Sequence, residues 1–246
     1  MTVPPRLRVI GAGRAGGSLA GALGRVGWDV VGLLGRDDDP TDAGADVDLL
    51  VIATPDHALA AVAATVVPHP ATVVAHLSGA RGLDVLGGHP RVAAIHPLVA
   101  LPDAHRGSIR LVSGAWFAIA GDPLAQRVVD DLHGRWFEVA DADRAAYHAA
   151  AVVASNHLVA LLGQVERIAG GIGVPPEAYL DLARATLENV AALGPAAALT
   201  GPAARGDWDT IARHLAALDP SEVEAYRALA AAARRLVAGD GLPADL

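Results

Sequence analysis

Residues 7–23 read LRVIGAGRAGGSLAGAL and join a short apolar segment to a run of small residues through a glycine-rich turn. Residues 7–10 have the composition of a buried strand, and the residues after the turn have that of a helix. The turn carries the spacing G-x-G-x-x-G, formed by Gly11, Gly13 and Gly16. A strand before this spacing and a helix after it form the context in which it indicates a nucleotide-binding turn.

Each residue of the turn has an expected task. Gly11 permits the tight turn, Gly13 leaves the backbone open to a pyrophosphate, and Gly16 lets the helix pack on the sheet. The backbone of Arg14 and Ala15 and the positive end of the helix would face the phosphates. We therefore predict a dinucleotide site here, the alternative being a tight strand–helix turn that binds nothing.

Composition narrows the class of protein. The 246 residues suit one large domain or two small ones, and a formal net charge of −8 argues against nucleic acid or an anionic membrane as the main partner. The absence of Cys excludes disulfides, thiolate metal sites and cysteine nucleophiles, and we predict no metal site. All 19 basic residues are Arg, which excludes Schiff-base chemistry and a lysine general acid. The chain opens without an apolar signal segment, so we expect a cytoplasmic protein.

The segment after the second predicted strand bears on the choice of cofactor. Residues 28–34 (WDVVGLL) predict that strand, and Arg36 follows it. An acidic side chain in this region accepts the ribose 2′-hydroxyl of NAD, whereas an Arg accommodates the 2′-phosphate of NADP. We predict NADP because of Arg36, while Asp37 and Asp38 leave NAD open as the less favoured cofactor.

Three later segments have the composition of further strands: 49–53, 72–77 and 92–95. Polar or turn residues follow or end each of them, namely Thr54-Pro55, Ser78 and His96. The carboxyl ends of parallel strands line the ligand crevice of this kind of sheet. We predict that Thr54, Pro55 and Ser78 lie beside the cofactor and that His96 lies at the substrate, the alternative for His96 being a structural hydrogen bond.

The pattern changes near the middle of the chain. Residues 110–120 predict one or two strands, and a last short strand is expected at 136–139. The sequence after residue 141 is helical throughout. We therefore predict a doubly wound, parallel α/β domain of the Rossmann type over residues 1–140, followed by an all-α domain over residues 141–246 for substrate binding and dimerisation.

The second half opens with a long predicted helix, 142–169. It carries no formal charge between Arg144 and Glu166, which suggests a membrane span by length alone. Polar residues interrupt it and flanking aromatic belts are missing, so we expect no membrane contact. A helix that is apolar nearly all round is instead expected to be buried in a domain core or a subunit interface.

Polar side chains on this helix are the candidate catalytic residues. His148 and Ser155 are seven residues apart and share a face of a regular helix, and Asn156 flanks it. Buried polar groups need partners, so the three residues make either structural hydrogen bonds or one wall of a substrate pocket. We favour the pocket.

The motifs VIGAGRAGGSLAGAL, ATPDHAL, HLSGA, IHPL, YHAAAVVASNHLVAL and ALTGPAARGDWDTIARHL span nearly the whole chain and resemble a bacterial family with a Rossmann-like half and a C-terminal domain of unknown function. The first half also resembles the NADP-binding domains of pyrroline-5-carboxylate reductase, ketopantoate reductase and the F420-dependent NADP oxidoreductases. The resemblance implies a helical C-terminal domain like that of the 6-phosphogluconate dehydrogenase superfamily. It also implies a homodimer formed through the long helix.

The expected function is hydride transfer between NADPH and a small C=O or C=N substrate, either ketopantoate-like or an imino acid. His148 is the first acid–base candidate and His96 the second, and Ser155 and Asn156 would orient the substrate. Ketopantoate reductases use a Lys on the long helix, which this chain lacks, so a C=N substrate fits it better. The alternatives are a regulatory or scaffold protein that binds NADP without turnover, and an oxidoreductase that uses flavin or F420.

Overall fold

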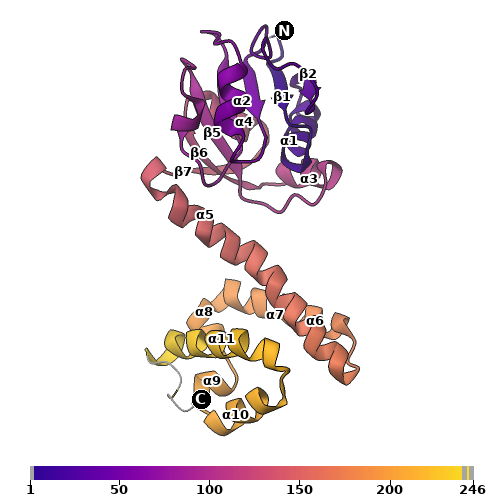
Figure 1. Cartoon of the computed structure of the whole chain (residues 1–246), viewed down its shortest axis with the longest axis vertical. Coiled ribbons are helices and arrows are strands. Elements are labelled where there is room, and N and C mark those ends of the chain that lie inside the picture. The colour runs from indigo at the N-terminus through magenta and orange to yellow at the C-terminus, as the bar shows by residue number, and fades with distance from the viewer. Residues whose placement is uncertain (1–2, 240–242, 244–246) are drawn as a thin grey trace. The chain divides into compact units, whose positions relative to one another are not determined.

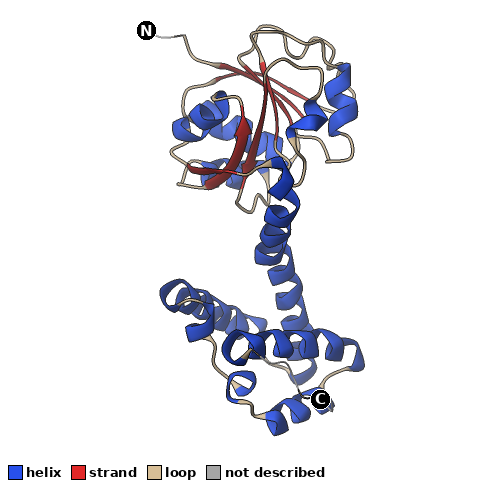
Figure 2. Cartoon of the chain, turned by 90° about the vertical axis from the view of Figure 1, so that its left-hand side faces the viewer, coloured by secondary structure: helices blue, strands red, loops and turns tan. Residues whose placement is uncertain are grey.

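The computed structural model describes residues 3–239 and residue 243. The chain divides into two compact units, Met1–Ser155 and Asn156–Leu246. Within the described residues, all strands belong to the first unit, and the second unit contains only helices and their connections (Figure 1 and Figure 2). The strand-to-helix change falls near residue 139, and the division between the units lies further along, inside the long helix.

The first unit is built on one seven-stranded sheet. Its strands are β1 (Arg6–Ile10), β2 (Asp29–Leu34), β3 (Leu49–Ile52), β4 (Val73–His76), β5 (Val92–Pro97), β6 (Trp116–Gly121) and β7 (Arg135–Glu138). They lie in the order β2-β1-β3-β4-β5-β6-β7, and every neighbouring pair is parallel except β5 and β6. The order turns at β1, which lies between β2 and β3. The predicted Rossmann-like α/β fold is therefore confirmed, with one antiparallel pair near the edge.

The helices of the first unit are α1 (Arg14–Arg25), α2 (Leu59–Thr65), α3 (Ala104–Leu111), α4 (Leu124–Asp131) and α5 (Arg144–Val152), with short 3-10 turns at Leu83–Leu86 and Asp141–Asp143. They cover both faces of the sheet, because side chains of the central strands alternate between two cores. Leu49 and Val51 of β3 pack in the core that includes residues of α1 and α4, whereas Leu50 and Ile52 pack in the core that includes α2. This double burial explains why β3 is apolar at every position.

The structure corrects the prediction for residues 110–120. Only β6 forms there, and residues 104–111 are the helix α3. Asp103 caps this helix by accepting the N–H of Arg106 at 2.8 Å. The helix packs on α1 through small residues, since a Cβ at Gly107 would overlap Ser18. The interpretation as a strand missed this close helix–helix contact, which depends on residues 85 positions apart or more.

The second unit contains the rest of the long helix and a set of shorter helices. A π-helical turn, Val153–His157, follows α5 and leads into α6 (Leu158–Ile172). The others are α7 (Pro176–Leu193), α8 (Pro195–Ala198), α9 (Pro202–Arg205), α10 (Trp208–Ala217) and α11 (Pro220–Ala238). Arg167 of α6 forms an ion pair with the largely buried Glu222 of α11, and Gln164 donates to the Glu222 carbonyl at 3.1 Å. These contacts connect α6 to α11.

The long helix is not buried within the chain. The most apolar 18-residue window of the segment Asp141–Ile172 has a mean hydropathy of 1.4, and none of the residues in that window is buried among the described residues. By length and composition it is the single helix in the described part of the chain that could cross a membrane. The prediction that it lies in a domain core is therefore wrong. The alternative, burial in a subunit interface, stays a prediction.

Candidate functional site

The glycine-rich turn connects β1 to α1 with the geometry that the motif predicts. Gly11 has a φ of +102°, a conformation that favours glycine, and a Cβ on it would lie 2.6 Å from the Ala53 carbonyl oxygen. A Cβ on Gly16 would lie 2.1 Å from the Gly11 carbonyl oxygen. Both positions therefore require glycine for packing alone, since any side chain would push the turn away from β3.

Gly13 differs from these two glycines. A Cβ placed on it would meet no described atom within 4 Å, so packing of the described residues does not demand glycine there. It is the N-cap of α1, and neither a side-chain cap nor an acidic side chain in the first turn appears in this described helix. The N–H groups at the start of α1, which begins at Arg14, are thus free of a competing anion. These features fit the pyrophosphate of a dinucleotide, which needs an open backbone at this point.

Arg36, Asp37 and Asp38 are neighbours in the loop after β2, but their side chains have different surroundings. Asp38 accepts the N–H of Gly35 at 2.7 Å and so closes the loop on itself. Arg36 is exposed and has no hydrogen-bond or ion-pair partner among the residues that the structure describes. Asp37 is exposed as well. The Asp38 carboxylate thus has a structural task, whereas the Arg36 guanidinium is available to a ligand.

The carboxyl end of β3 lies against the glycine turn. A Cβ on Gly11 would lie 3.3 Å from the backbone nitrogen of Thr54, which follows this strand. The Thr54 hydroxyl is buried and has no hydrogen-bond partner among the described residues. Pro55 is exposed beside it. A buried hydroxyl without a partner is uncommon and is a candidate to bind a ligand group.

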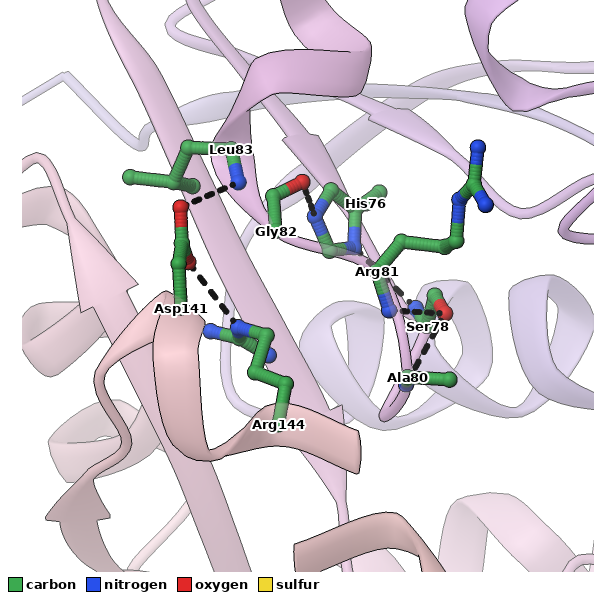
Figure 3. A network of polar contacts seen from close by, with 8 residues as sticks. All are labelled: His76, Ser78, Ala80, Arg81, Gly82, Leu83, Asp141 and Arg144. Carbon is green, nitrogen blue, oxygen red and sulfur yellow. Dashed lines mark hydrogen bonds and ion pairs between the residues drawn. The ribbon is translucent and has the colours of Figure 1, made fainter. Parts of the chain in front are cut away.

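The loop after β4 is held by the buried His76. Its Nδ1 accepts the N–H of Ser78 at 3.2 Å, and its Nε2 lies 3.2 Å from the Gly82 carbonyl oxygen (Figure 3). The Ser78 hydroxyl accepts the N–H groups of Ala80 and Arg81, at 3.2 and 3.1 Å. Burial and the nearby Arg144 cation lower the pKa of His76 to about 4. His76 is therefore neutral at pH 7, with Nδ1 free to accept and the proton on Nε2.

Two predicted catalytic residues, His96 and His148, meet at this loop. Their rings are T-shaped with centroids 6.1 Å apart, and a Cβ on Gly79 would lie 2.9 Å from Nε2 of His96 and 2.8 Å from Cδ2 of His148. His96 comes from β5 and His148 from α5, so the first turns of the long helix bring the second histidine to the carboxyl end of β5. The two rings leave no room for a side chain at position 79, so packing requires glycine there.

The sequence interpretation missed Tyr147, which contacts His96 directly. The Tyr147 hydroxyl lies 2.5 Å from Nδ1 of His96, with the two rings nearly perpendicular. Burial lowers the pKa of His96 to about 4, and the electrostatic effects of His148 and Arg144 act in the same direction. Burial raises the pKa of Tyr147 to about 12, and the Arg144 cation works against that rise. At neutral pH the pair is therefore a phenol and an uncharged imidazole.

Arg144 is the second residue that the sequence interpretation did not select as functional. Its side chain is 1% exposed, and its Nε donates to Asp141 at 3.2 Å, while Asp141 also accepts the N–H of Leu83 at 3.1 Å (Figure 3). The other two guanidinium nitrogens are buried without a hydrogen-bond partner in the described part of the chain. The spacing Arg144–Tyr147–His148 on one helix, three and four residues, was the signal that could have revealed this group.

Ser155 and Asn156 belong to the π-helical turn and are exposed. Their side chains make no hydrogen bond to another described residue. The π turn interrupts the regular α-helical spacing from which we expected His148 and Ser155 to share one face. A substrate-orienting role for Ser155 and Asn156 stays a prediction.

A comparison with protein families matches one segment of the chain. Residues 116–233 match a family described as a domain of unknown function, DUF2520. The matched segment starts at β6 in the first unit and includes α5 with Tyr147 and His148. No curated protein matches the sequence.

Solved structures of similar fold span almost the whole chain. A Bacteroides fragilis protein provisionally assigned as an NADP oxidoreductase is 21% identical, with a TM-score of 0.80 over 94% of this chain and 98% of the other. A Thermotoga maritima protein is also 21% identical, with a TM-score of 0.71 over 95% and 98%. Pyrroline carboxylate reductase of Plasmodium falciparum, solved with NADP bound, is 13% identical, with a TM-score of 0.60 over 95% and 98%. The chain thus has the fold of NAD(P)-dependent oxidoreductases.

Proposed function

We propose that this protein is an NADP-dependent oxidoreductase that transfers a hydride between NADPH and a C=O or C=N bond of a small substrate. The observation that carries the proposal is the glycine turn: Gly11 and Gly16 are required by packing, whereas Gly13 is open. An open glycine at a helix start with no competing acid is the feature that a bound pyrophosphate explains. The fold shared with NAD(P)-dependent oxidoreductases supports the same conclusion.

The chain offers a group for each part of the cofactor. The backbone from Gly11 to Gly16, with Arg14 and Ala15, would hold the pyrophosphate, and Arg36 would hold the 2′-phosphate through its planar guanidinium. Thr54, Pro55 and Ser78 would lie beside the cofactor at the strand ends. When bound, NADPH would supply the hydride, and the protein would supply orientation and a proton.

His96 is the residue that we propose as proton donor. It lies near the carboxyl end of β5, with its Nε2 toward Gly79, whereas its Nδ1 is hydrogen-bonded to the Tyr147 hydroxyl. His148, whose ring also lies against Gly79, would contact the substrate. A C=N substrate stays the preferred class, because an iminium carbon is already activated and the chain has no lysine acid.

Titration with NADPH and NADH tests the proposal. We expect the wild-type protein to bind NADPH more tightly than NADH and to be stabilised against heat by it. Gly13→Ala should fold normally, because its methyl group meets open space, and should lose NADPH affinity by at least about 10-fold, since the methyl group occupies the pyrophosphate position.

Gly170→Ala is the matched control for this experiment. It adds the same methyl group to open space in α6, among the described residues, and should leave NADPH affinity unchanged. If wild type binds neither nucleotide, the glycine turn is only a packing device and the proposed activity is wrong. If it binds NADPH and reduces no oxo or imino acid, the alternative of a non-catalytic NADP-binding protein is favoured.

We further propose that the protein is cytoplasmic and forms a homodimer in which the second copy covers the long helix. Between residues 156 and 239, Ala169 and Ile211 are the hydrophobic residues that are buried, which is too little for a stable core. Large apolar side chains are exposed instead, including Val159 at 69%, Ile172 at 68% and Leu182 at 62%. A surface this apolar is typical of an obligate interface, and a second copy is the partner implied by the family resemblance.

A further inference from the structure

We propose that Tyr147 replaces the proton that His96 gives to the substrate, and that the buried Arg144 guanidinium stabilises the phenolate that this transfer leaves behind. The inference rests on the proposed reductase activity and assigns a proton relay to that site. Three observations carry it: the hydrogen bond between Tyr147 and His96, the position of the far nitrogen of His96 beside Gly79 and His148, and the two unpartnered nitrogens of Arg144.

The hydrogen bond determines which nitrogen of His96 carries the proton. A neutral imidazole has one N–H, and the Tyr147 phenol is protonated at neutral pH. Nδ1 is the single described partner of the Tyr147 hydroxyl, so the phenol donates to Nδ1 and the imidazole proton resides on Nε2. That tautomer is inferred from the network of donors and acceptors. His96 thus presents an N–H donor at Nε2, toward Gly79.

A neutral imidazole cannot give up its Nε2 proton without compensation at Nδ1. Its own conversion to an imidazolate is too unfavourable, whereas transfer of the Tyr147 proton to Nδ1 keeps the ring neutral throughout. The Nε2–H bond breaks as the oxygen of a C=O substrate, or the nitrogen of a neutral C=N substrate, gains that proton, and the Tyr147 O–H bond breaks as Nδ1 gains the second proton. An iminium substrate already carries its proton and would be reduced without this step. The reduced nicotinamide supplies the hydride to the substrate carbon. The net result is a reduced substrate, oxidised cofactor, neutral His96 and a Tyr147 phenolate, which water reprotonates.

Arg144 explains how the phenolate could form. Arg144 precedes Tyr147 by three residues on α5, a spacing at which side chains are neighbours. Two of its nitrogens are buried without an acceptor, which is costly for a charged group in a resting protein. The cost has a purpose if the matching anion exists only during the reaction, because a fixed cation then stabilises charge where it develops.

The other charged groups around the pair do not replace Arg144. His76 of β4 and His148 of α5 are further titratable groups that act on His96, and neither of them forms an anion. Asp56 and Asp141 are acidic and therefore disfavour a phenolate. Asp141 is half exposed, and it accepts a hydrogen bond from Nε of Arg144. Arg144 is therefore the one described cation that acts on Tyr147.

A fluorinated tyrosine at position 147 allows the effect of Arg144 on the phenol pKa to be measured without turnover. Its phenol is more acidic than that of tyrosine, so ¹⁹F NMR can follow its ionisation in the full-length protein. We expect Arg144→Met to raise the phenol pKa by at least about one unit, because removal of a nearby cation disfavours the anion. Arg144→Lys should restore part of the shift. Arg184→Met, which removes an exposed Arg of the second unit, should cause none.

Kinetics test the relay itself with the best oxo or imino acid substrate. Tyr147→Phe and Arg144→Met should each lower kcat about 100-fold while leaving the NADPH affinity unchanged. The double variant should be no slower than Tyr147→Phe, because Arg144 acts through the phenolate that this variant cannot form. ¹⁵N NMR of labelled histidine, assigned with His96→Gln, should show the Nε2–H form in wild type.

The possible failures are distinct. Three results would each overturn the relay while NADPH binding and turnover persist. They are an unchanged phenol pKa in Arg144→Met, full kcat in Tyr147→Phe, and a KM effect of Arg144→Met without a kcat effect. Loss of the proposed function has another signature, since a wild-type protein that binds no NADPH overturns both the reductase activity and the relay, whatever the ¹⁹F titration gives.

Discussion

Gly79 and His96 are so close that a Cβ on the glycine would lie 2.9 Å from Nε2 of the histidine. Carbon atoms do not approach a ring nitrogen this closely, so one of the two residues would have to move. Gly79 is buried in the loop between β4 and the following 3-10 turn, and its backbone lies against the His96 ring. The missing side chain is therefore required for the present positions of His96 and His148.

Gly79→Ala is predicted to abolish most turnover without affecting the cofactor. The methyl group would displace His96 or His148, so we expect kcat/KM to fall at least about 100-fold. NADPH affinity should be unchanged, as measured by fluorescence titration. Gly163→Ala in α6, where the nearest described side chain is the flexible Arg167, is the control and should retain activity. Full activity in Gly79→Ala would show that turnover does not depend on the present positions of His96 and His148.

The assignment of Arg36 predicts the cofactor preference. Arg36→Ala should weaken NADPH binding by about 10-fold to 100-fold and leave NADH binding unchanged, because only NADPH carries the 2′-phosphate that the guanidinium would contact. Asp37→Ala is the reciprocal variant at the neighbouring exposed position and should change neither affinity. A drop in NADH affinity for Asp37→Ala, with no effect of Arg36→Ala, would instead favour NAD.

The buried His76 predicts a loss of stability in mild acid. Its pKa is about 4 in the folded protein and about 6.5 in an unfolded chain, so the unfolded state binds the extra proton as pH falls below 6.5. The free energy of unfolding should therefore decrease between pH 6.5 and 4 by up to about 3 kcal/mol from this residue, with no further contribution below pH 4.

Chemical denaturation at several pH values measures this effect. His76→Asn keeps an acceptor for the Ser78 N–H and should flatten the pH dependence of the unfolding free energy. His133→Asn is the control, because His133 is exposed with a φ of +55° that Asn tolerates, and it should leave the pH dependence as in wild type. Equal slopes for wild type and His76→Asn would contradict the assignment.

The proposed dimer predicts a concentration-dependent assembly. Val159→Asp adds a charge to the most exposed of the large apolar residues on α6, so it should shift the mass measured by light scattering from dimer to monomer and lower the melting temperature. Glu177→Ala, which removes a charge at the exposed start of α7, should leave the dimer intact. A monomeric wild type, or one that binds phospholipid vesicles through this helix, would refute the dimer.

His148 and Asn156 separate an enzyme from a scaffold protein. In an enzyme, His148→Ala should lower kcat and Asn156→Ala should raise the KM of the substrate, each by about 10-fold or more, with NADPH affinity unchanged. A scaffold would show no activity to lose and no change in binding. His157→Ala, the neighbouring exposed position in the π turn, serves as the control for local effects on the helix.

Local sequence patterns carried most of the fold. An apolar run and the G-x-G-x-x-G spacing are local signals, so they predicted the buried strand β3 and the glycine turn, although residues distant in the chain pack against both. The helix α3 was missed because what stabilises it is contact with α1, about 85 residues earlier, together with a single capping residue, Asp103. A short helix of this kind has little periodic signal of its own.

The sequence by itself determined the class of fold, the glycine-rich turn and the two candidate histidines, because strand and helix periodicity and glycine spacing are local properties of the chain. Only the tertiary structure decided which groups meet. Tyr147 bonds His96 across 51 residues, and Arg144 is buried with two unpartnered nitrogens. Neither follows from a pattern along α5, since the position of that helix against β5 and the loop at Gly79 determines which of its side chains are removed from water and which find a partner.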